Sequence, residues 1–230
     1  MLALFFEVNP RPDGGWDRYL AIAAGLRPLL AEQEGMLFID RYRSLLRPGT
    51  ILSHSLWLDE AALAAWRSHG LHHCAQSEGR QQVFDDYRLR IAHVTHTVAP
   101  GRDALRSPVR SSYRDRTGSA ARIMVVAQGC GELANVRARP ADLFESLNRE
   151  GERLWLFDAV DDVEGVAIAC DLHTAGLTAR VCEVERDYGM FDRTEAPQYH
   201  PPVARLVCPL PSEAPSWNKA EHIRAWFKSG

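Results

Sequence analysis

The stretch "MLFIDRYRSLLRPGTILSHSLWLDEAALAAWRSH", residues 36–69, decides the fold. Two runs rich in β-branched and aromatic residues, 36–45 and 51–58, are joined by the turn sequence "RPGT". This pattern predicts a β-hairpin, because proline and glycine favour a tight reversal between strands. Asp59 stands directly before "EAALAAWRSH", where its carboxylate can accept hydrogen bonds from the free amides that begin a helix. The stretch therefore predicts strand, strand and helix.

The flanking sequence completes the first half of the chain. "LALFFEV" (2–8) predicts a strand that the turn sequence "NPRPDGG" ends. Apolar residues then recur at helical spacing over 16–34, and Pro28 is expected to bend that helix. The alternating run "YRLRIAHVTHTV" (87–98) predicts the last strand. The resulting order, β-α-β-β-α-β, is typical of a ferredoxin-like unit with its own four-stranded sheet.

The second half is expected to repeat this unit in degenerate form. "ARIMVVAQ" predicts a strand and "RPADLFESLNREG" (139–151) a helix with Pro140 in its first turn. "RLWLFDAV" and "EGVAIACDLH" (153–173) predict a hairpin, and "TARVCEVERDYGMF" a final strand. The second helix is expected to be missing, because only "TAGL" separates the last two strands. The predicted domains are 1–99, a linker at 100–120, the second copy at 121–200, and an extension with a helix at 201–230.

Composition excludes several classes of function. With 46% hydrophobic and 25% charged residues and a formal net charge of -3, the chain has the balance of a soluble globular protein. We therefore expect no nucleic-acid partner and no membrane partner. The five cysteines contain no CxxC motif and indicate neither a disulfide framework nor a zinc ribbon. The N-terminal apolar run lacks a basic flank and is too short to span a bilayer, which favours a cytoplasmic location.

The hairpin, "SLWLDEAALAAWRSH" and "AQSEGR" followed by "DYRLRIA" resemble the antibiotic biosynthesis monooxygenase family over about the first 97 residues. A segment like "RDYGMFDRTEAP" (186–197) follows the last strand in single-domain relatives, and here it lies in the second copy. The resemblance implies an α+β fold of tandem ferredoxin-like domains, whose antiparallel sheets pack as a dimeric α+β barrel. We expect the barrel to close within one chain as an intramolecular pseudo-dimer, because an apolar sheet face must be covered. A homodimer is allowed but not required.

The same resemblance implies a function. Better-known members oxidise aromatic polyketides with O2 and need neither metal nor flavin, so the chain is expected to be a cofactor-independent monooxygenase of a small aromatic substrate. One alternative is a haem-binding or haem-degrading monooxygenase. In that branch Trp66 would match the cleft tryptophan, but Glu7 and Gln76 would stand where an asparagine and the haem-ligating histidine are expected. The other alternative is a non-catalytic small-molecule-binding or stabilising protein.

The stretch "AAWRSHGLHHCAQSEGR" (64–80) holds the main site candidates. On one continuous helix Trp66, His69 and His73 would share a face, and His72 would lie off it. Trp66 would form an aromatic wall for a planar substrate, and His69 or His73 would take its proton. A metal site on His69 and His73 is the weaker hypothesis, since no acidic residue stands between them.

Other candidates lie on the strands. Glu7 would share a face of the first strand with Phe5, which the resemblance assigns to the cleft. Glu7 would act as a second base if burial raised its pKa, or would pair with an arginine. Phe5, Trp57 and His72 complete the predicted substrate-binding set, with Trp57 and His54 on opposite faces of their strand. Tyr188 and Asp192 would act as a lid or as a packing arm.

Overall fold

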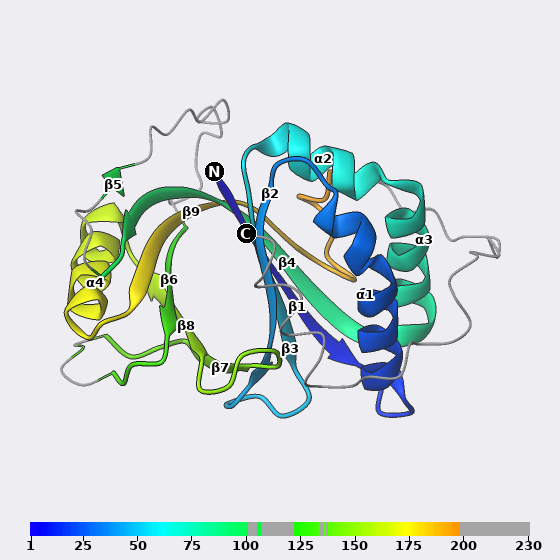
Figure 1. The fold of residues 1–230 in the computed structure, drawn as a ribbon, viewed down its shortest axis with the longest axis horizontal. Coiled ribbons are helices and arrows are strands. Elements are labelled where there is room, and N and C mark those ends of the chain that lie inside the picture. The colour runs from blue at the N-terminus through cyan, green and yellow to red at the C-terminus, as the bar shows by residue number, and fades with distance from the viewer. Residues whose placement is uncertain (101–104, 107–121, 134–135, 137, 198–230) are drawn as a thin grey trace.

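The computed structural model describes residues 1–100, 105–106, 122–133, 136 and 138–197 (Figure 1). Most of the predicted linker at 100–120 and the whole predicted extension at 201–230 lie outside the described residues. The proposed domain boundaries therefore stay predictions.

The first half has the predicted order of elements. It consists of β1 (Leu2–Pro10), α1 (Gly15–Ala31), β2 (Met36–Ser44), β3 (Ile51–Trp57), α2 (Glu60–Ser68), α3 (Gly70–Glu78), a π-helical turn η1 (Gly79–Val83) and β4 (Phe84–Val98). The Asp59 carboxylate caps α2 as expected, accepting a hydrogen bond from the Ala62 amide at 2.9 Å. Pro28 lies inside α1, as predicted from its spacing.

The second half differs from the prediction in two places. It consists of β5 (Leu105–Arg106), β6 (Ile123–Gly129), β7 (Asp142–Ser146), β8 (Arg153–Ala159), α4 (Asp162–Thr174) and β9 (Thr178–Gly189). The helix expected over 139–151 is wrong, because this segment contains β7. The hairpin expected over 153–173 is also wrong, because β8 leads into α4. Among the described residues, the copy keeps its second helix and has no counterpart of α1.

Local contacts explain why α4 is a helix. The Asp161 carboxylate accepts from the Glu164 amide at 2.8 Å, and the Glu164 carboxylate accepts from the Val160 amide at 2.7 Å. These two bonds satisfy amide donors at the helix start. Gly165 lies against the sheet, where an added Cβ would stand 2.9 Å from Val181 and 3.0 Å from Ile123. This glycine therefore lets α4 pack closely.

All the described strands belong to one closed sheet. Its order is β1-β3-β2-β7-β8-β6-β9-β4, with β5 added at β4, and β4 pairs back with β1. The two halves meet at β2–β7 and at β4–β9, both antiparallel (Figure 1). The expectation of two separate sheets is therefore wrong, since hydrogen bonds join them at both edges. The predicted closure of a pseudo-dimeric barrel within one chain is confirmed.

The core has three layers. One apolar cluster fills the barrel, a second lies between the first-half strands and α1–α3, and a third lies between the second-half strands and α4. The helices cover the outside of the barrel on opposite sides (Figure 1). None of the helices in the described ranges is long and apolar enough to cross a membrane. The cytoplasmic location stays a prediction.

Candidate functional site

A pocket of about 190 Å³ lies between the outer face of the first-half strands and helices α1–α3. Its walls are mainly apolar and aromatic, and most of them come from β1–β4, the three helices and η1. The aromatic residues that line it are Phe6, Tyr19, Trp57, Trp66, Phe84, Tyr87 and Tyr188. A concave, largely apolar pocket with a few polar groups is the usual form of a small-molecule site.

The helix that carries the histidines is broken at His69. This residue is extended, with φ -61° and ψ 129°, so that α2 ends there and α3 starts anew. The break changes the direction in which the following side chains point. His72 lines the pocket, whereas His69 and His73 do not belong to its lining. The expectation that Trp66, His69 and His73 share one face against the cleft is wrong for this reason.

His72 is held in one orientation by Trp66. Its ring stacks on the indole with centroids 4.4 Å apart, and its Nδ1 lies 2.9 Å from the Trp66 carbonyl oxygen. A carbonyl oxygen can only accept, so this contact places the proton on Nδ1 and the lone pair on Nε2; Gln76 Nε2, 3.1 Å from the same Nδ1, then donates to the Arg67 carbonyl oxygen rather than to the imidazole. Burial lowers the pKa of His72 to about 4. At neutral pH the residue is an uncharged imidazole in the pocket wall.

Both predicted tryptophans line the pocket. Trp57 is almost fully buried, and its indole Nε1 donates to the Ser55 hydroxyl at 2.9 Å. His69 packs near the Trp66 ring, with centroids 5.8 Å apart, and its Nδ1 has no hydrogen-bond partner among the described residues. In the part of the chain that the structure describes, no group of His, Cys, Asp and Glu is arranged to hold a metal.

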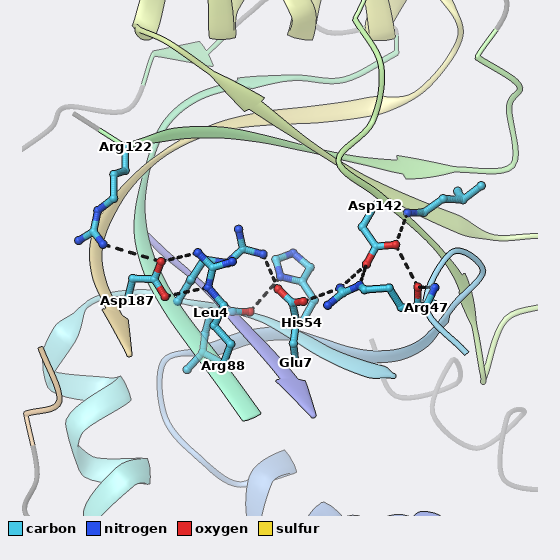
Figure 2. Close-up of polar contacts among 11 residues, drawn as sticks. Leu4, Glu7, Arg47, His54, Arg88, Arg122, Asp142 and Asp187 are labelled. Carbon is cyan, nitrogen blue, oxygen red and sulfur yellow. Dashed lines mark hydrogen bonds and ion pairs between the residues drawn. The ribbon is translucent and has the colours of Figure 1, made fainter. Parts of the chain in front are cut away.

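Glu7 and Phe5 lie on the other side of β1, inside the barrel. Figure 2 shows the Glu7 carboxylate bonded to Arg47, with Nη2 at 2.5 Å, and Arg90 bonds it as well. Burial would raise the pKa of Glu7, but these two guanidinium groups hold it below its usual value. The expectation that this face lines the cleft is wrong, since Leu4 and Phe6 line it instead. Glu7 was expected either to act as a base or to pair with an arginine, and the structure shows the ion pair with arginine.

His54 also points into the barrel, opposite to Trp57 as predicted. Its Nδ1 lies 3.0 Å from the Leu4 carbonyl oxygen (Figure 2). Its ring stacks on Phe5. Burial, with Arg180 nearby, lowers the pKa of His54 to about 3. The barrel interior is therefore a packed core with fixed ion pairs.

The second half contributes two residues to the pocket of the first. Tyr188, at the end of β9, packs into the core cluster beside α1–α3, and Arg193 follows it in the chain; both line the pocket. Arg193 and Arg80 each donate an Nη1 proton to the Tyr87 hydroxyl at 2.7 Å. Sequence reasoning missed Tyr87, Arg80 and Arg193. The available signal was the family-like tail at 186–197, which contains Arg193.

Comparison with known proteins assigns the family. A family model described as antibiotic biosynthesis monooxygenase matches residues 1–78. Jasmonate monooxygenase ABM of Pyricularia oryzae is 35% identical to this chain over 218 residues, which cover 89% of this chain and 100% of that protein. The chain belongs to the antibiotic biosynthesis monooxygenase family. Membership makes this chain a monooxygenase, an enzyme of the oxidoreductase class.

Solved structures of other antibiotic biosynthesis monooxygenases are more distant. One antibiotic biosynthesis monooxygenase is 18% identical to this chain, with 40% of this chain and 95% of that chain covered and a TM-score of 0.36. An anthrone oxidase-like protein is 10% identical, with 85% and 95% covered and a TM-score of 0.36.

Proposed function

We propose that this chain is a cofactor-independent monooxygenase that oxidises a small, largely apolar molecule held against Trp57 and Trp66. The observation that carries the proposal is the neutral His72, fixed by the Trp66 carbonyl in the wall of an apolar pocket. Its Nε2 is the proton acceptor. This moves the role of base from His69 or His73, as predicted from the sequence, to His72.

The chemistry needs a proton acceptor because O2 reacts slowly with neutral organic molecules. Removal of a proton from a carbon beside a carbonyl, or from a phenol, gives an anion that can pass an electron to O2. A positioned general base contributes about 10²- to 10⁴-fold to such a step. Conversion of a methylene group to a carbonyl consumes one O2 and releases one water, and the substrate supplies all four electrons. No external reductant is then required.

The size of the pocket supports this proposal. Pockets for drug-sized ligands usually have volumes of about 300–1,000 Å³, whereas this one has about 190 Å³. A flavin or haem bound together with substrate would require the pocket to widen. At the position where the family resemblance puts a haem-ligating histidine, the Gln76 amide donates to the Arg67 carbonyl oxygen at 3.1 Å. The residues at this position do not fit a haem ligand.

The relative favours jasmonate as substrate. The Pyricularia oryzae protein named for jasmonate matches along its entire length, and the match covers 89% of this chain. Jasmonate is a cyclopentanone carboxylic acid, and the carbons beside its ketone are weakly acidic. It is small and mainly apolar, in keeping with the walls of this pocket.

An aromatic, polyketide-like substrate such as an anthrone is the second candidate. The observation that favours it is the number of aromatic side chains around the cavity, Trp57 and Trp66 among them. Aromatic walls suit planar rings, which stack on them at small entropic cost.

Oxygen uptake by the purified chain tests the proposal. Jasmonic acid and an anthrone are each supplied with and without NADPH. The ¹⁸O content of products formed under ¹⁸O2 is measured by mass spectrometry. We expect uptake without NADPH, one ¹⁸O atom in the product, and less than stoichiometric iron or flavin in the preparation. Activity that depends on added haem, iron or a reductant would overturn cofactor independence. Binding without oxygen uptake would indicate the non-catalytic binder instead.

A further inference from the structure

Two serine hydroxyls lie in the wall of the pocket that the sheet forms. Ser53 and Ser55 are alternate residues of β3, so their side chains project from the same face as Trp57, and all three residues line the pocket. Ser53 is 7% exposed and Ser55 is 3% exposed. A hydroxyl group buried without hydrogen-bond partners costs free energy, so the partners of these two serines have to be accounted for.

Ser55 accepts one hydrogen bond and keeps its proton free. The Trp57 indole Nε1 donates to its oxygen at 2.9 Å. Its cross-strand neighbours, Leu4 on β1 and Ile39 on β2, are apolar and line the pocket as well. Among the described residues, no group accepts the Ser55 hydroxyl proton. Because the bond from the indole polarises the hydroxyl, this proton is a stronger donor than that of an isolated serine.

The Ser53 hydroxyl makes no hydrogen bond to any residue in the described part of the chain. Its cross-strand neighbours are Phe6 on β1 and Arg41 on β2. A phenyl ring has no oxygen or nitrogen lone pair and a guanidinium group has donors only, so neither side chain can accept the Ser53 proton. Alternate residues of a strand lie about 7 Å apart. One small ligand can therefore reach both serines.

Two free hydroxyl donors in a largely apolar wall suit an uncharged oxygen acceptor. A ketone oxygen has two lone pairs for hydrogen bonds and brings no charge that would need a buried counter-ion. A hydrocarbon of the same shape would leave both hydroxyls without a partner. A site whose buried polar groups bond to a substrate rejects the analogue that lacks the bonding group, because those polar groups are then left unpaired.

We infer that the Ser53 and Ser55 hydroxyls bind the carbonyl oxygen of the substrate, and that the substrate is a ketone. His72 lies on α3, in the opposite wall of the pocket. When the proton of the carbon beside the carbonyl passes to His72 Nε2, the electron pair of that C–H bond forms an enolate. Negative charge then develops on the oxygen that the serines hold, and their hydrogen bonds strengthen. This step rests on the proposed function, whereas ketone binding can be measured without turnover.

Infrared spectroscopy of a bound ketone measures these bonds directly. The probes are 2-pentylcyclopentanone and fluorenone, labelled with ¹³C at the carbonyl and bound to the full chain without oxygen, so that both candidate skeletons are covered and no turnover occurs. A hydrogen bond weakens the C=O bond, so the carbonyl band of at least one probe should lie below its position in a hydrocarbon solvent. Ser55→Ala and Ser53→Ala should each move this band back toward that position.

Equilibrium binding of the same ketones and of their hydrocarbons, pentylcyclopentane and fluorene, measures the contribution of the bonds to affinity. The preference for ketone over hydrocarbon should fall about three- to tenfold in each serine variant, as expected for one hydrogen bond. Ser77→Ala is the matched control, because this buried hydroxyl donates to the His73 carbonyl oxygen outside the pocket lining, and the preference should stay unchanged. Ser53→Ala removes no hydrogen bond between described residues, so it tests the inference even if Ser55→Ala fails to fold.

Three outcomes would overturn the inference. They are no binding of either ketone, a carbonyl band that neither serine substitution moves, and a ketone preference that both serine variants keep. His72→Gln should retain the lowered band, since it removes the base and leaves both donors in place. If ketones bind in the serine-dependent way but no oxygen is consumed with jasmonic acid or an anthrone, the proposed monooxygenation fails while the carbonyl site stands. Oxygen uptake by a chain whose serine variants bind ketones normally would give the reverse result.

Discussion

Trp66 holds His72 by two contacts at once, an indole face 4.4 Å from the imidazole and a carbonyl oxygen 2.9 Å from Nδ1. The first contact desolvates the imidazole, and the second fixes its tautomer. Burial lowers the pKa and outweighs the hydrogen bond, which by itself raises it, so the ring is neutral; the hydrogen bond leaves the lone pair on Nε2. One residue therefore sets the charge and the orientation of the candidate base.

Replacing His72 should show which of the three neighbouring histidines acts as the base. In His72→Gln the base is lost, and kcat should fall by about 10²-fold or more. His73→Gln, one position away on the same helix, should keep kcat within about threefold, because His73 is not part of the pocket lining. Steady-state oxygen uptake measures both variants. A larger loss in His73→Gln than in His72→Gln would return the base to the position predicted from the sequence.

Stability should fall between neutral and mildly acid pH. The pKa values of His54 and His72 are lowered in the folded chain to about 3 and about 4, whereas an unfolded histidine has about 6.5. As the pH falls below about 6.5, the unfolded state binds these protons first, so stability is present above this pH and is lost toward pH 3–4. One pKa unit is worth about 1.4 kcal/mol, which gives a loss of roughly 1–2 kcal/mol per histidine by pH 5.

Urea unfolding at pH 7, 6 and 5 measures this loss. The pKa values of Glu7 and Asp187 are also lowered, but these carboxylates titrate below about pH 4.5, outside this window. The His54→Gln variant should show a smaller decrease from pH 7 to 5 than the native chain. An increase in the free energy of unfolding over this range would contradict the assignment of both histidines as buried and neutral.

Glu7→Gln should affect stability and leave catalysis intact. Loss of the Glu7 charge leaves Arg90 buried without it, and breaking such a buried pair costs about 3–5 kcal/mol. For a chain of this size that lowers Tm by roughly 6–20 °C. kcat at 20 °C should stay within about threefold of the native value. A loss of 10²-fold in kcat with an unchanged Tm would instead support the other predicted role of Glu7, that of a base.

The first half of the fold could be predicted because its signals are local. The "RPGT" turn, the Asp59 cap and the alternation of β4 each act within a few residues. The prediction for 142–146 is wrong because the strand is only five residues long and pairs on one side with β2, which is distant in sequence, so its pairing with the nearby β8 is only part of what makes it a strand. For α4 a local signal was present, since Asp161 and Glu164 have the spacing of a capping box. The β-branched residues that follow obscured it.

The site was predictable only in part for a similar reason. Trp57, Trp66 and His72 were named from the sequence, and all three line the pocket. The choice among the histidines depended on the phase of the helix, which the extended backbone at His69 resets. Gly70 directly after it was the visible sign of a break. Arg193 reaches the pocket only because β9 pairs with β4 across the seam between the halves.

The first half alone should not persist as a folded monomer. Removing residues 121–230 would leave β2 without β7 and β4 without β9. It would also expose the barrel face of the first half, which includes Phe5, Tyr42 and Leu52, all with about 0% exposure in the full chain. Open strand edges beside an apolar face favour pairing with another chain. Residues 1–100 should therefore form a two-fold dimer or aggregate.

Size-exclusion chromatography with light scattering tests the oligomeric state of residues 1–100. The fragment and the full chain are compared at the same concentrations. A dimer should dissociate only together with unfolding, because the same hydrogen bonds and apolar contacts hold both. Its Tm should then rise with protein concentration, as mass action requires. The full chain closes its barrel internally, so its Tm should be independent of concentration if it is a monomer. A fragment 1–100 that is monomeric, folded and as stable as the full chain would show that the second half is not needed to cover the first.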